Sequence, residues 1–387
     1  MKRYLYVMML TSFLPVYCNN PDSKMLDIVE GDILDIEEIS SYRDISLDVM
    51  YEIGDTYSED ISDIQGEELI TPYDSPQTPS RGFFMGGLPV PTNGESFADA
   101  YAKQSGYSEF VPVWGQPTPF YALAEVLSGS WGEEFVDGYI RGNRMFPLIN
   151  MSFIDEDITH KDITLISPPE IGNATLSNPM WRAAYKKAAI DIVKASHPLL
   201  FSLGNEVNRW YEKYGMDGEN GFSHYISLYE EIYDEVKKLS PDTKVYCVFA
   251  REIVSKNRVA DMSVIKLFNP EKLDLLVITS YPYATGRSRP AKIENDYYSA
   301  VASYIPDRPF GFSEVAWPSL DVFGGEQGQA DFLMQIAGRL TKDRGINLYL
   351  IGWAWFVDLD EKDTIGLIKR DGTEKLGYKV WKDIFGW

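Results

Sequence analysis

The sequence predicts a (β/α)8 TIM barrel that follows an acidic N-terminal extension, and three observations lead to this fold class. Eight short apolar runs rich in β-branched and aromatic residues follow one another after residue 81. Segments with helical periodicity separate these runs, and this alternation is typical of a parallel barrel with an outer ring of helices. The fourth and seventh runs each end in a glutamate, which fits a fold that gathers the C-terminal ends of its strands at one rim.

The expected elements follow from periodicity and from breakers such as Pro198 and Pro241. The predicted strands are Gly82–Pro89, Phe110–Gln116, Met145–Met151, Leu199–Asn208, Lys244–Ala250, Leu273–Tyr283, Pro309–Trp317 and Ile346–Val357. The predicted helices include Trp131–Arg141, Met180–Ser196, Phe222–Leu239, Gln327–Lys342 and a final helix near Lys375–Ile384. A doubly wound sheet is the alternative, but it needs a glycine-rich phosphate turn after its first strand, which Gly86-Gly87-Leu88-Pro89 does not supply.

The N-terminus is predicted to be an export signal over residues 1–18. A basic start, Met1-Lys2-Arg3, precedes a largely apolar run from Tyr4 to Tyr17 that is too short for a stable transmembrane helix. Cys18 stands where a bacterial lipoprotein signal places its acylated cysteine, although Pro15-Val16-Tyr17 differs from the small residues expected there. A lipid anchor at Cys18 and ordinary secretion are both open, so we expect a secreted or cell-surface protein.

Residues 19–80 are predicted to form an acidic linker or a loosely attached segment. Between Asp27 and Glu68 there are 15 acidic residues and one basic residue, Arg43, without a clean strand or helix period. The prolines at positions 72, 76 and 79 then mark a boundary, and residues 81–387 form the predicted barrel.

Composition limits the possible partners and cofactors. The formal net charge of -22 argues against nucleic acid or an anionic membrane surface and favours a neutral substrate. The aromatic content of 14% suits stacking on sugar rings, and an aromatic-rich core is the alternative explanation. The two cysteines and three histidines show no metal-ligand spacing. We therefore expect no metal, no organic cofactor and a monomeric chain.

The two glutamates carry the most specific signal. They lie in Ser202-Leu203-Gly204-Asn205-Glu206-Val207-Asn208 and in Gly311-Phe312-Ser313-Glu314-Val315-Ala316-Trp317-Pro318. A carboxylate at the end of a buried strand is costly unless it has a function or a partner. A pair of carboxylates is what glycoside hydrolysis requires, and a buried ion pair at each position is the alternative.

These strings resemble the clan A glycoside hydrolases, in which Asn-Glu ends the fourth strand and a second Glu ends the seventh. Ser313-Glu314-Val315-Ala316-Trp317-Pro318-Ser319 is similar to the nucleophile motif of family 17 (the β-1,3-glucanases), with Ala316 in place of the usual Gly. Ser280-Tyr281-Pro282-Tyr283 resembles families 17 and 53 (the β-1,4-galactanases). The resemblance covers roughly residues 81–387. It implies a retaining β-glycosidase that hydrolyses a neutral β-linked polysaccharide or oligosaccharide of the glucan, galactan or mannan type.

The resemblance also implies roles for individual residues. Glu206 would be the acid/base and Glu314 the nucleophile, while Asn205 would bind the 2-hydroxyl of the sugar. Tyr281 would donate its hydroxyl to Glu314, with Tyr283 as the second candidate for that role. Members of the clan usually carry an arginine on strand two, and none occurs in Phe110–Gln116.

Tryptophans near strand ends are the predicted substrate platforms, and each could instead belong to the core. In the eighth strand, simple alternation predicts that Trp353 and Trp355 face the same way. The resemblance to the clan implies a tryptophan here as the floor of the −1 subsite, for which Trp355 is favoured, with Trp353 as a deeper packing residue. Trp317, Trp114 and Trp210 are further candidates for stacking on sugar rings. The long connection of residues 152–179 is expected to shape subsites at the active rim.

Two other function classes compete with this interpretation. The first is a catalytically inactive carbohydrate-binding barrel protein, which the missing arginine favours and the two intact glutamates oppose. The second is a barrel enzyme of different chemistry, such as an aldolase or a metal-dependent hydrolase. It would require a lysine or a histidine cluster at the strand ends, and the sequence shows neither.

Overall fold

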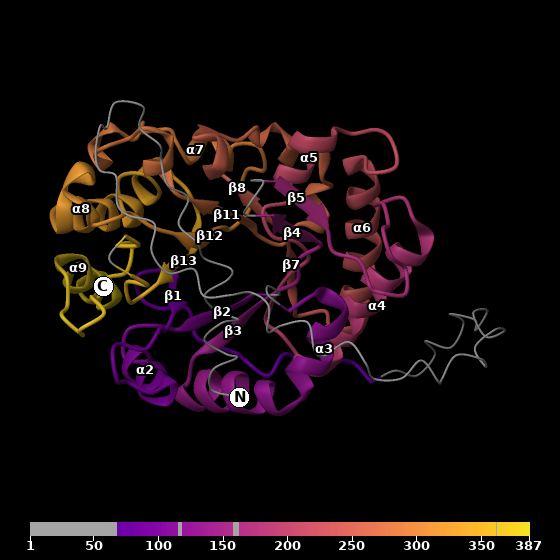
Figure 1. Cartoon of the computed structure of the whole chain (residues 1–387), viewed down its shortest axis with the longest axis horizontal. Coiled ribbons are helices and arrows are strands. Elements are labelled where there is room, and N and C mark those ends of the chain that lie inside the picture. Colours follow the sequence, from indigo (N-terminus) through magenta and orange to yellow (C-terminus); the bar gives the residue numbers. More distant parts are fainter. Residues whose placement is uncertain (1–67, 115–117, 158–161, 361) are drawn as a thin grey trace, which may run out of the picture. The chain divides into compact units, whose positions relative to one another are not determined.

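A computed structural model describes residues 68–114, 118–157, 162–360 and 362–387 (Figure 1). The predicted signal at residues 1–18 and residues 19–67 of the predicted acidic segment lie outside these ranges.

The core is a nine-stranded parallel sheet in the order β7-β6-β3-β2-β1-β13-β12-β11-β8, with helices around it (Figure 1). β7 and β8 are two halves of the fifth barrel strand and are separated at Cys247; β7 pairs with β6, and β8 pairs with β11, so the sheet closes on itself. The predicted (β/α)8 barrel is confirmed, and a doubly wound sheet is excluded. The strands are β1 (Phe84–Leu88), β2 (Phe110–Trp114), β3 (Phe146–Asn150), β6 (Leu200–Ser202), β7 (Lys244–Tyr246), β8 (Val248–Ala250), β11 (Leu276–Ser280), β12 (Phe310–Val315) and β13 (Leu348–Trp355).

The outer layer holds the predicted helices and several shorter ones. Its α-helices are α2 (Phe97–Gln104), α3 (Phe120–Ser128), α4 (Pro179–Ser196), α5 (Asn208–Tyr214), α6 (Phe222–Leu239), α7 (Ser299–Ala302), α8 (Gly325–Ala337) and α9 (Leu376–Phe385). A π-helix, η2 (Gly132–Ile140), occupies the predicted helix at 131–141. The predicted bounds of α6 are confirmed, whereas α8 ends at Ala337, before the predicted Lys342.

Helix α4 shows why the predicted helices form. The Asn178 side chain accepts hydrogen bonds from the backbone N–H groups of Met180 and Trp181, and Pro179 occupies the first turn, where its missing N–H costs nothing. Its buried face includes Trp181 and Tyr185, which stack at 5.1 Å. The long connection before α4 contains an antiparallel hairpin of β4 (Ile154–Asp157) and β5 (Asp162–Leu165), which the sequence did not predict.

The barrel interior below the C-terminal ends of the strands is filled by side chains. Phe84, Phe110 and Phe146 are buried there, with ring centroids 5.2 Å apart for Phe84–Phe146 and 5.8 Å apart for Phe110–Phe146. Gly86 makes this packing possible, because a Cβ at that position would lie 2.7 Å from the Phe110 ring. The interior is therefore a packed core, and polar side chains are left to the C-terminal ends of the strands.

Residues 69–80, which the sequence analysis assigned to the linker, pack on the barrel. The N–H of Ile70 donates to the carbonyl of Leu239, and that of Tyr73 donates to the carbonyl of His197. The Tyr73 ring stacks on the His197 imidazole at 4.1 Å. The compact unit thus begins at Leu69, ahead of the predicted boundary.

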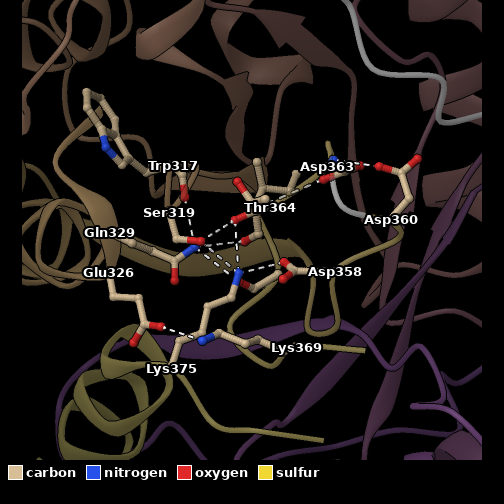
Figure 2. A network of polar contacts seen from close by, with 12 residues as sticks. Trp317, Ser319, Glu326, Gln329, Asp358, Asp360, Asp363, Thr364, Lys369 and Lys375 are labelled. Atoms are coloured by element: carbon tan, nitrogen blue, oxygen red, sulfur yellow. Dashed lines mark hydrogen bonds and ion pairs between the residues drawn. The ribbon is translucent and has the colours of Figure 1, made fainter. Parts of the chain in front are cut away.

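The buried side chain of Lys375 stabilises the closing segment, which is the stretch between β13 and α9 (Figure 2). The Lys375 amine donates to Asp358 Oδ1 at 2.6 Å, to Ser319 Oγ at 2.9 Å and to the carbonyl of Gly366 at 2.8 Å. Burial raises the pKa of Asp358 to about 6 and lowers the pKa of Lys375. The ion pair links two points of the segment after β13, and the bond to Ser319 ties this segment to the loop after β12.

Replacing this lysine tests the role of the pair. Lys375→Met should lower the free energy of unfolding by about 3–5 kcal/mol at pH 8, because Asp358 would stay buried without its cation. Urea denaturation measures this loss, which should shrink at pH 5, where Asp358 is protonated. Lys379→Met, at an exposed position of the same helix, is the control and should change stability by less than about 0.5 kcal/mol. A loss below 1 kcal/mol for Lys375→Met would contradict the assignment.

Candidate active site

The direction of Glu314 depends on an irregularity in strand β12. In the pairing of β11 with β12, Ile278 lies opposite Phe312 and Thr279 lies opposite Glu314, so Ser313 is an extra residue. Phe312 faces outward, where it packs edge-on against Tyr298 at 4.9 Å. Regular alternation would turn Glu314 outward as well. The bulge at Ser313 therefore turns the Glu314 side chain into the barrel.

Glu206 follows β6 in a left-handed backbone conformation, with φ of +51°. Such a conformation costs a non-glycine residue about 1–3 kcal/mol and persists only when its surroundings hold it. The hydroxyls of Tyr185 and Tyr225 provide this support, because both donate to the Leu203 carbonyl, at 2.8 and 2.9 Å. Gly204 allows the close packing, since a Cβ there would lie 2.6 Å from the Tyr225 hydroxyl.

Strand β11 brings the two glutamates together. Thr279 donates its hydroxyl to Glu206 Oε1 at 2.7 Å, and Tyr281 donates its hydroxyl to Glu314 Oε2 at 2.6 Å. Thr279 and Tyr281 are two residues apart, so their side chains share one face and lie about 6–7 Å apart along the chain. Two carboxylates separated by 108 residues in the sequence are therefore held side by side at the barrel rim.

Glu206 has a second hydrogen-bond donor, and the phenol that donates to Glu314 stays protonated. Arg209 donates to Glu206 Oε2 at 2.8 Å. Burial raises the pKa of the Tyr281 phenol well above its usual range, and the nearby charges of Glu314 and Glu206 raise it further. The phenol therefore stays protonated and can act as a donor to Glu314. The hydrogen bond from Tyr281 to Glu314 is the contact that the motif resemblance led us to expect.

Asn205 and Trp114, two predicted site residues, lie at the same rim. Asn205 is half-buried beside Glu206, and its Oδ1 is buried with no hydrogen-bond partner among the described residues. Trp114 ends β2 and pairs in register with Asn150 at the end of β3. Tyr283 is half-buried and packs edge-on against Tyr281, with ring centroids 6.3 Å apart.

The structure adds polar residues that the sequence analysis missed. Asn150 is 1% exposed, and its Oδ1 has no hydrogen-bond partner in the described part of the chain. Glu252, on the short strand β9 (Glu252–Ile253), is a buried carboxylate that accepts from the N–H of Tyr281 at 2.7 Å. Both residues, like Thr279, lie at or next to the C-terminal end of a predicted strand, so their positions were the available signal.

The prediction that Trp353 and Trp355 face the same way is wrong. Gly87 pairs with Trp353 and Leu88 pairs with Trp355, so Ala354 is a bulged residue. Because consecutive residues of β1 face opposite sides, the two tryptophans do too. Trp353 faces the outer helices and packs near Trp381 at 6.5 Å, whereas Trp355 faces the barrel interior.

Three of the predicted platforms are core residues. Trp353 and Trp317 are fully buried, and Trp210 is 1% exposed. Their indole N–H groups donate to the carbonyls of Ile365, Phe323 and Asn220, respectively. Their ring faces are covered by side chains, so the prediction that these residues stack on sugar does not hold. Trp114 and Trp355 remain as candidates.

Asp363 lies against the Trp355 indole at the end of β13. Burial raises its pKa to about 7, and the charges of Asp358 and Asp360 add to this increase. The N–H of Ile365 and the indole of Trp355 act in the opposite direction. A carboxyl group that titrates near neutral pH thus supports one wall of the rim.

No group of three or more His, Cys, Asp or Glu side chains within the described ranges is arranged to hold a metal ion. None of the helices in those ranges combines the length and apolarity that a membrane crossing needs. Strand β2 carries no arginine.

No family model and no curated protein sequence matches the chain. Among solved structures it is similar to the GH5_18 protein of Streptomyces cattleya in complex with GlcNAc, with a TM-score of 0.53, 12% identity and coverage of 79% of this chain and 80% of that one. A GH5_18 protein of Bifidobacterium longum subsp. infantis gives a TM-score of 0.52, 14% identity and coverage of 79% and 78%. The exo-β-1,4-mannosidase Op5Man5 of Opitutaceae bacterium strain TAV5 gives a TM-score of 0.52 and 14% identity, with coverage of 80% of this chain and 62% of that one. At these identities the similarity establishes the barrel fold shared with glycoside hydrolases.

The environment of Asp363 predicts a pH dependence of stability. Its pKa in the folded protein, about 7, lies above the ordinary value of 3.8. The folded state therefore binds more protons between about pH 4 and 7, and this contribution to stability falls as the pH rises through that window. Asp363→Asn should raise Tm relative to wild type by several degrees more at pH 8 than at pH 4.5, as measured by scanning calorimetry.

The control for this prediction is Asp371→Asn in the same closing segment. Bonds from Thr373 lower the pKa of Asp371, so its effect on the pH dependence has the opposite sign. An unchanged pH dependence of Tm in Asp363→Asn would show that Asp363 does not titrate in this range.

Proposed function

We propose that this protein is a retaining β-glycosidase that acts by a two-glutamate double displacement. One observation carries the proposal: Glu206 and Glu314 reach the same rim of the barrel, where Thr279 of β11 holds the first and Tyr281, the residue after β11, holds the second. Retaining glycosidases need two carboxyl groups about 5–5.5 Å apart on either side of the scissile bond. The shared barrel fold of glycoside hydrolases supports this reaction class.

The contacts suggest how the work is divided. Glu314, fixed by the Tyr281 phenol, attacks the anomeric carbon as the glycosidic C–O bond breaks, which forms a glycosyl ester. Glu206 gives its proton to the leaving oxygen. In the second step Glu206 removes a proton from water, the water oxygen attacks the anomeric carbon, and Glu314 leaves as a carboxylate.

The first step requires Glu206 to carry a proton. A protonated Glu206 keeps some acceptor capacity but loses the negative charge that strengthens its bond from Arg209. We therefore infer that the contact of Arg209 with Oε2 weakens when Glu206 takes up its proton, while Thr279 continues to hold Oε1.

The substrate that we propose is a neutral β-linked glucan, galactan or mannan. The amide oxygens of Asn205 and Asn150 have no hydrogen-bond partner among the described residues and suit sugar hydroxyls. Trp114 is half-buried at the rim, and Trp355, which is 6% exposed, faces the interior beside it. Among similar structures, one is in complex with GlcNAc and another with Manb1-4GlcNAc. The proposal also includes three further points, which are the similarity of the motifs to families 17 and 53, a secreted or cell-surface location and a monomeric state.

A catalytically inactive carbohydrate-binding protein is the second candidate. The absence of an arginine from β2 and the ion pair of Arg209 with Glu206 favour it. The active-enzyme proposal is preferred because both carboxylates and the supporting phenol are in place.

Covalent trapping of the glycosyl-enzyme tests the proposal. A panel of activated 2-deoxy-2-fluoro glycosides should add the mass of one sugar to the intact protein, with the label on the Glu314 peptide. The label should be absent in Glu314→Ala and present in Glu326→Ala, a control on helix α8. If no sugar labels the protein and no polysaccharide is hydrolysed, the binding-protein function is correct.

The acid/base role of Glu206 predicts a dependence on the leaving group. Glu206→Ala should reduce hydrolysis of a natural β-linked substrate about 100- to 10,000-fold. It should slow the first step on a dinitrophenyl glycoside far less, since that leaving group needs no proton. Azide should restore turnover and yield a β-glycosyl azide, detected by NMR. An α-glycosyl azide, or rescue of Glu314→Ala instead, would reverse the assignments.

A further inference from the structure

The structure contains a further carboxylate next to the proposed site, and the proposed reaction gives it no part in the bond changes. Glu252 is 2% exposed and lies just beyond the end of the fifth barrel strand. We propose that Glu252 is a positioning residue, which holds the Tyr281 backbone so that the Tyr281 phenol orients Glu314. This inference rests on the proposed function, in which Glu314 is the nucleophile.

Glu252 holds the end of strand β11 from outside the barrel. Its Oε2 accepts from the N–H of Tyr281 at 2.7 Å, and its Oε1 accepts from the Ser280 hydroxyl at 3.1 Å. Ser280 faces outward and Tyr281 faces inward, so one carboxylate binds both residues at the point where the strand ends. Pro282 follows and has no N–H, which makes the Tyr281 N–H the last backbone donor before the loop turns away.

Both carboxylate oxygens of Glu252 accept hydrogen bonds. Besides Ser280 and Tyr281, the Tyr297 hydroxyl donates to Oε1 at 2.5 Å. Only an ionised carboxylate can accept from all three donors, because a glutamine would place an NH2 group against at least one of them. The sequence position therefore requires a glutamate although its size alone would allow a glutamine.

Arg251 partly compensates the buried charge of Glu252, whereas Arg287, which packs on the same Tyr297 ring, is paired with Glu294. The guanidinium carbons of Arg251 and Arg287 lie 4.1 and 4.5 Å from the centroid of the Tyr297 ring, whose hydroxyl binds Glu252. Burial raises the pKa of Glu252, while the hydrogen bonds from Tyr297, Tyr281 and Ser280 and the charge of Arg251 lower it. A buried carboxylate supported in this way can hold the backbone rigidly.

The effect on the nucleophile follows from distance. The Tyr281 hydroxyl lies 2.6 Å from Glu314 Oε2, and a displacement of about 1 Å in a catalytic constellation can reduce the rate about 100-fold. Releasing the Tyr281 backbone would let the phenol drift from Glu314. Glu252 would therefore affect the step in which Glu314 attacks, and not the affinity for substrate.

A double-mutant cycle tests this inference. Glu252→Gln should slow labelling of Glu314 by the 2-fluoro glycoside about 10- to 100-fold with little change in KM, and Tyr281→Phe should do the same. The double variant should be no more than about three-fold slower than Tyr281→Phe, because the two residues act in series. Both single variants should move the acid limb of the pH profile of kcat/KM to higher pH, which loss of stability alone would not do.

Glu326→Gln is the matched control, since Glu326 also accepts a backbone N–H, from Leu376 at 3.0 Å, but on helix α8. It should label at the wild-type rate. Hydrogen exchange of the peptide containing Tyr281 should accelerate in Glu252→Gln, and this readout does not require activity. If Glu252→Gln does not fold, Tyr297→Phe removes one donor contact and should show a smaller effect of the same kind.

The outcomes separate this inference from the proposed function. A labelled wild type with a normal rate in Glu252→Gln, or with fully multiplicative effects in the double variant, overturns the role of Glu252 alone. Absence of any label on the wild type overturns the proposed function and this role with it.

Discussion

The site depends on the register between β11 and β12. Because Ser313 is an extra residue in β12, Thr279 lies opposite Glu314, and both side chains face the barrel interior. Without the bulge, Glu314 would follow Phe312 outward into the layer of helices, where a carboxylate would be buried among apolar groups. The same device recurs at Ala354 in β13, where it turns Trp355 inward and leaves Trp353 outside. Two irregularities in adjacent strands thus determine which residues can meet a substrate.

Strand β11 acts as the support for the whole rim. Thr279 reaches Glu206 from the inner face of the strand, Ser280 reaches Glu252 from its outer face, and Tyr281, the residue that follows the strand, reaches Glu314. Each carboxylate therefore receives hydroxyl or backbone donors, as a buried acid requires. This arrangement holds the end of the strand in place, with Glu252 and Glu314 buried and Glu206 half-buried.

The aromatic richness of the chain has two separate uses. Trp317, Trp210 and Trp353 pack between the strands and the outer helices, and each donates its N–H to a main-chain carbonyl. Buried tyrosines support the backbone before Glu206 in the same way. An aromatic side chain that faces the barrel interior at the end of a strand, such as Trp114, can contact a ligand. High aromatic content by itself therefore indicates a well-packed barrel as much as a sugar site.

The sequence alone determined the class of fold, the eight strand positions and the two glutamates at strand ends, because hydrophobic periodicity and strand-end polarity are local properties. It also supplied the partnership of Tyr281 with Glu314, through a motif resemblance. Only the tertiary structure decided the side-chain directions at Ser313 and Ala354, since a bulge depends on the neighbouring strand. The roles of Glu252, Thr279 and Asn150 were likewise decided there. Hydrogen bonds between strands far apart in the chain depend on closure of the barrel, which no local pattern encodes.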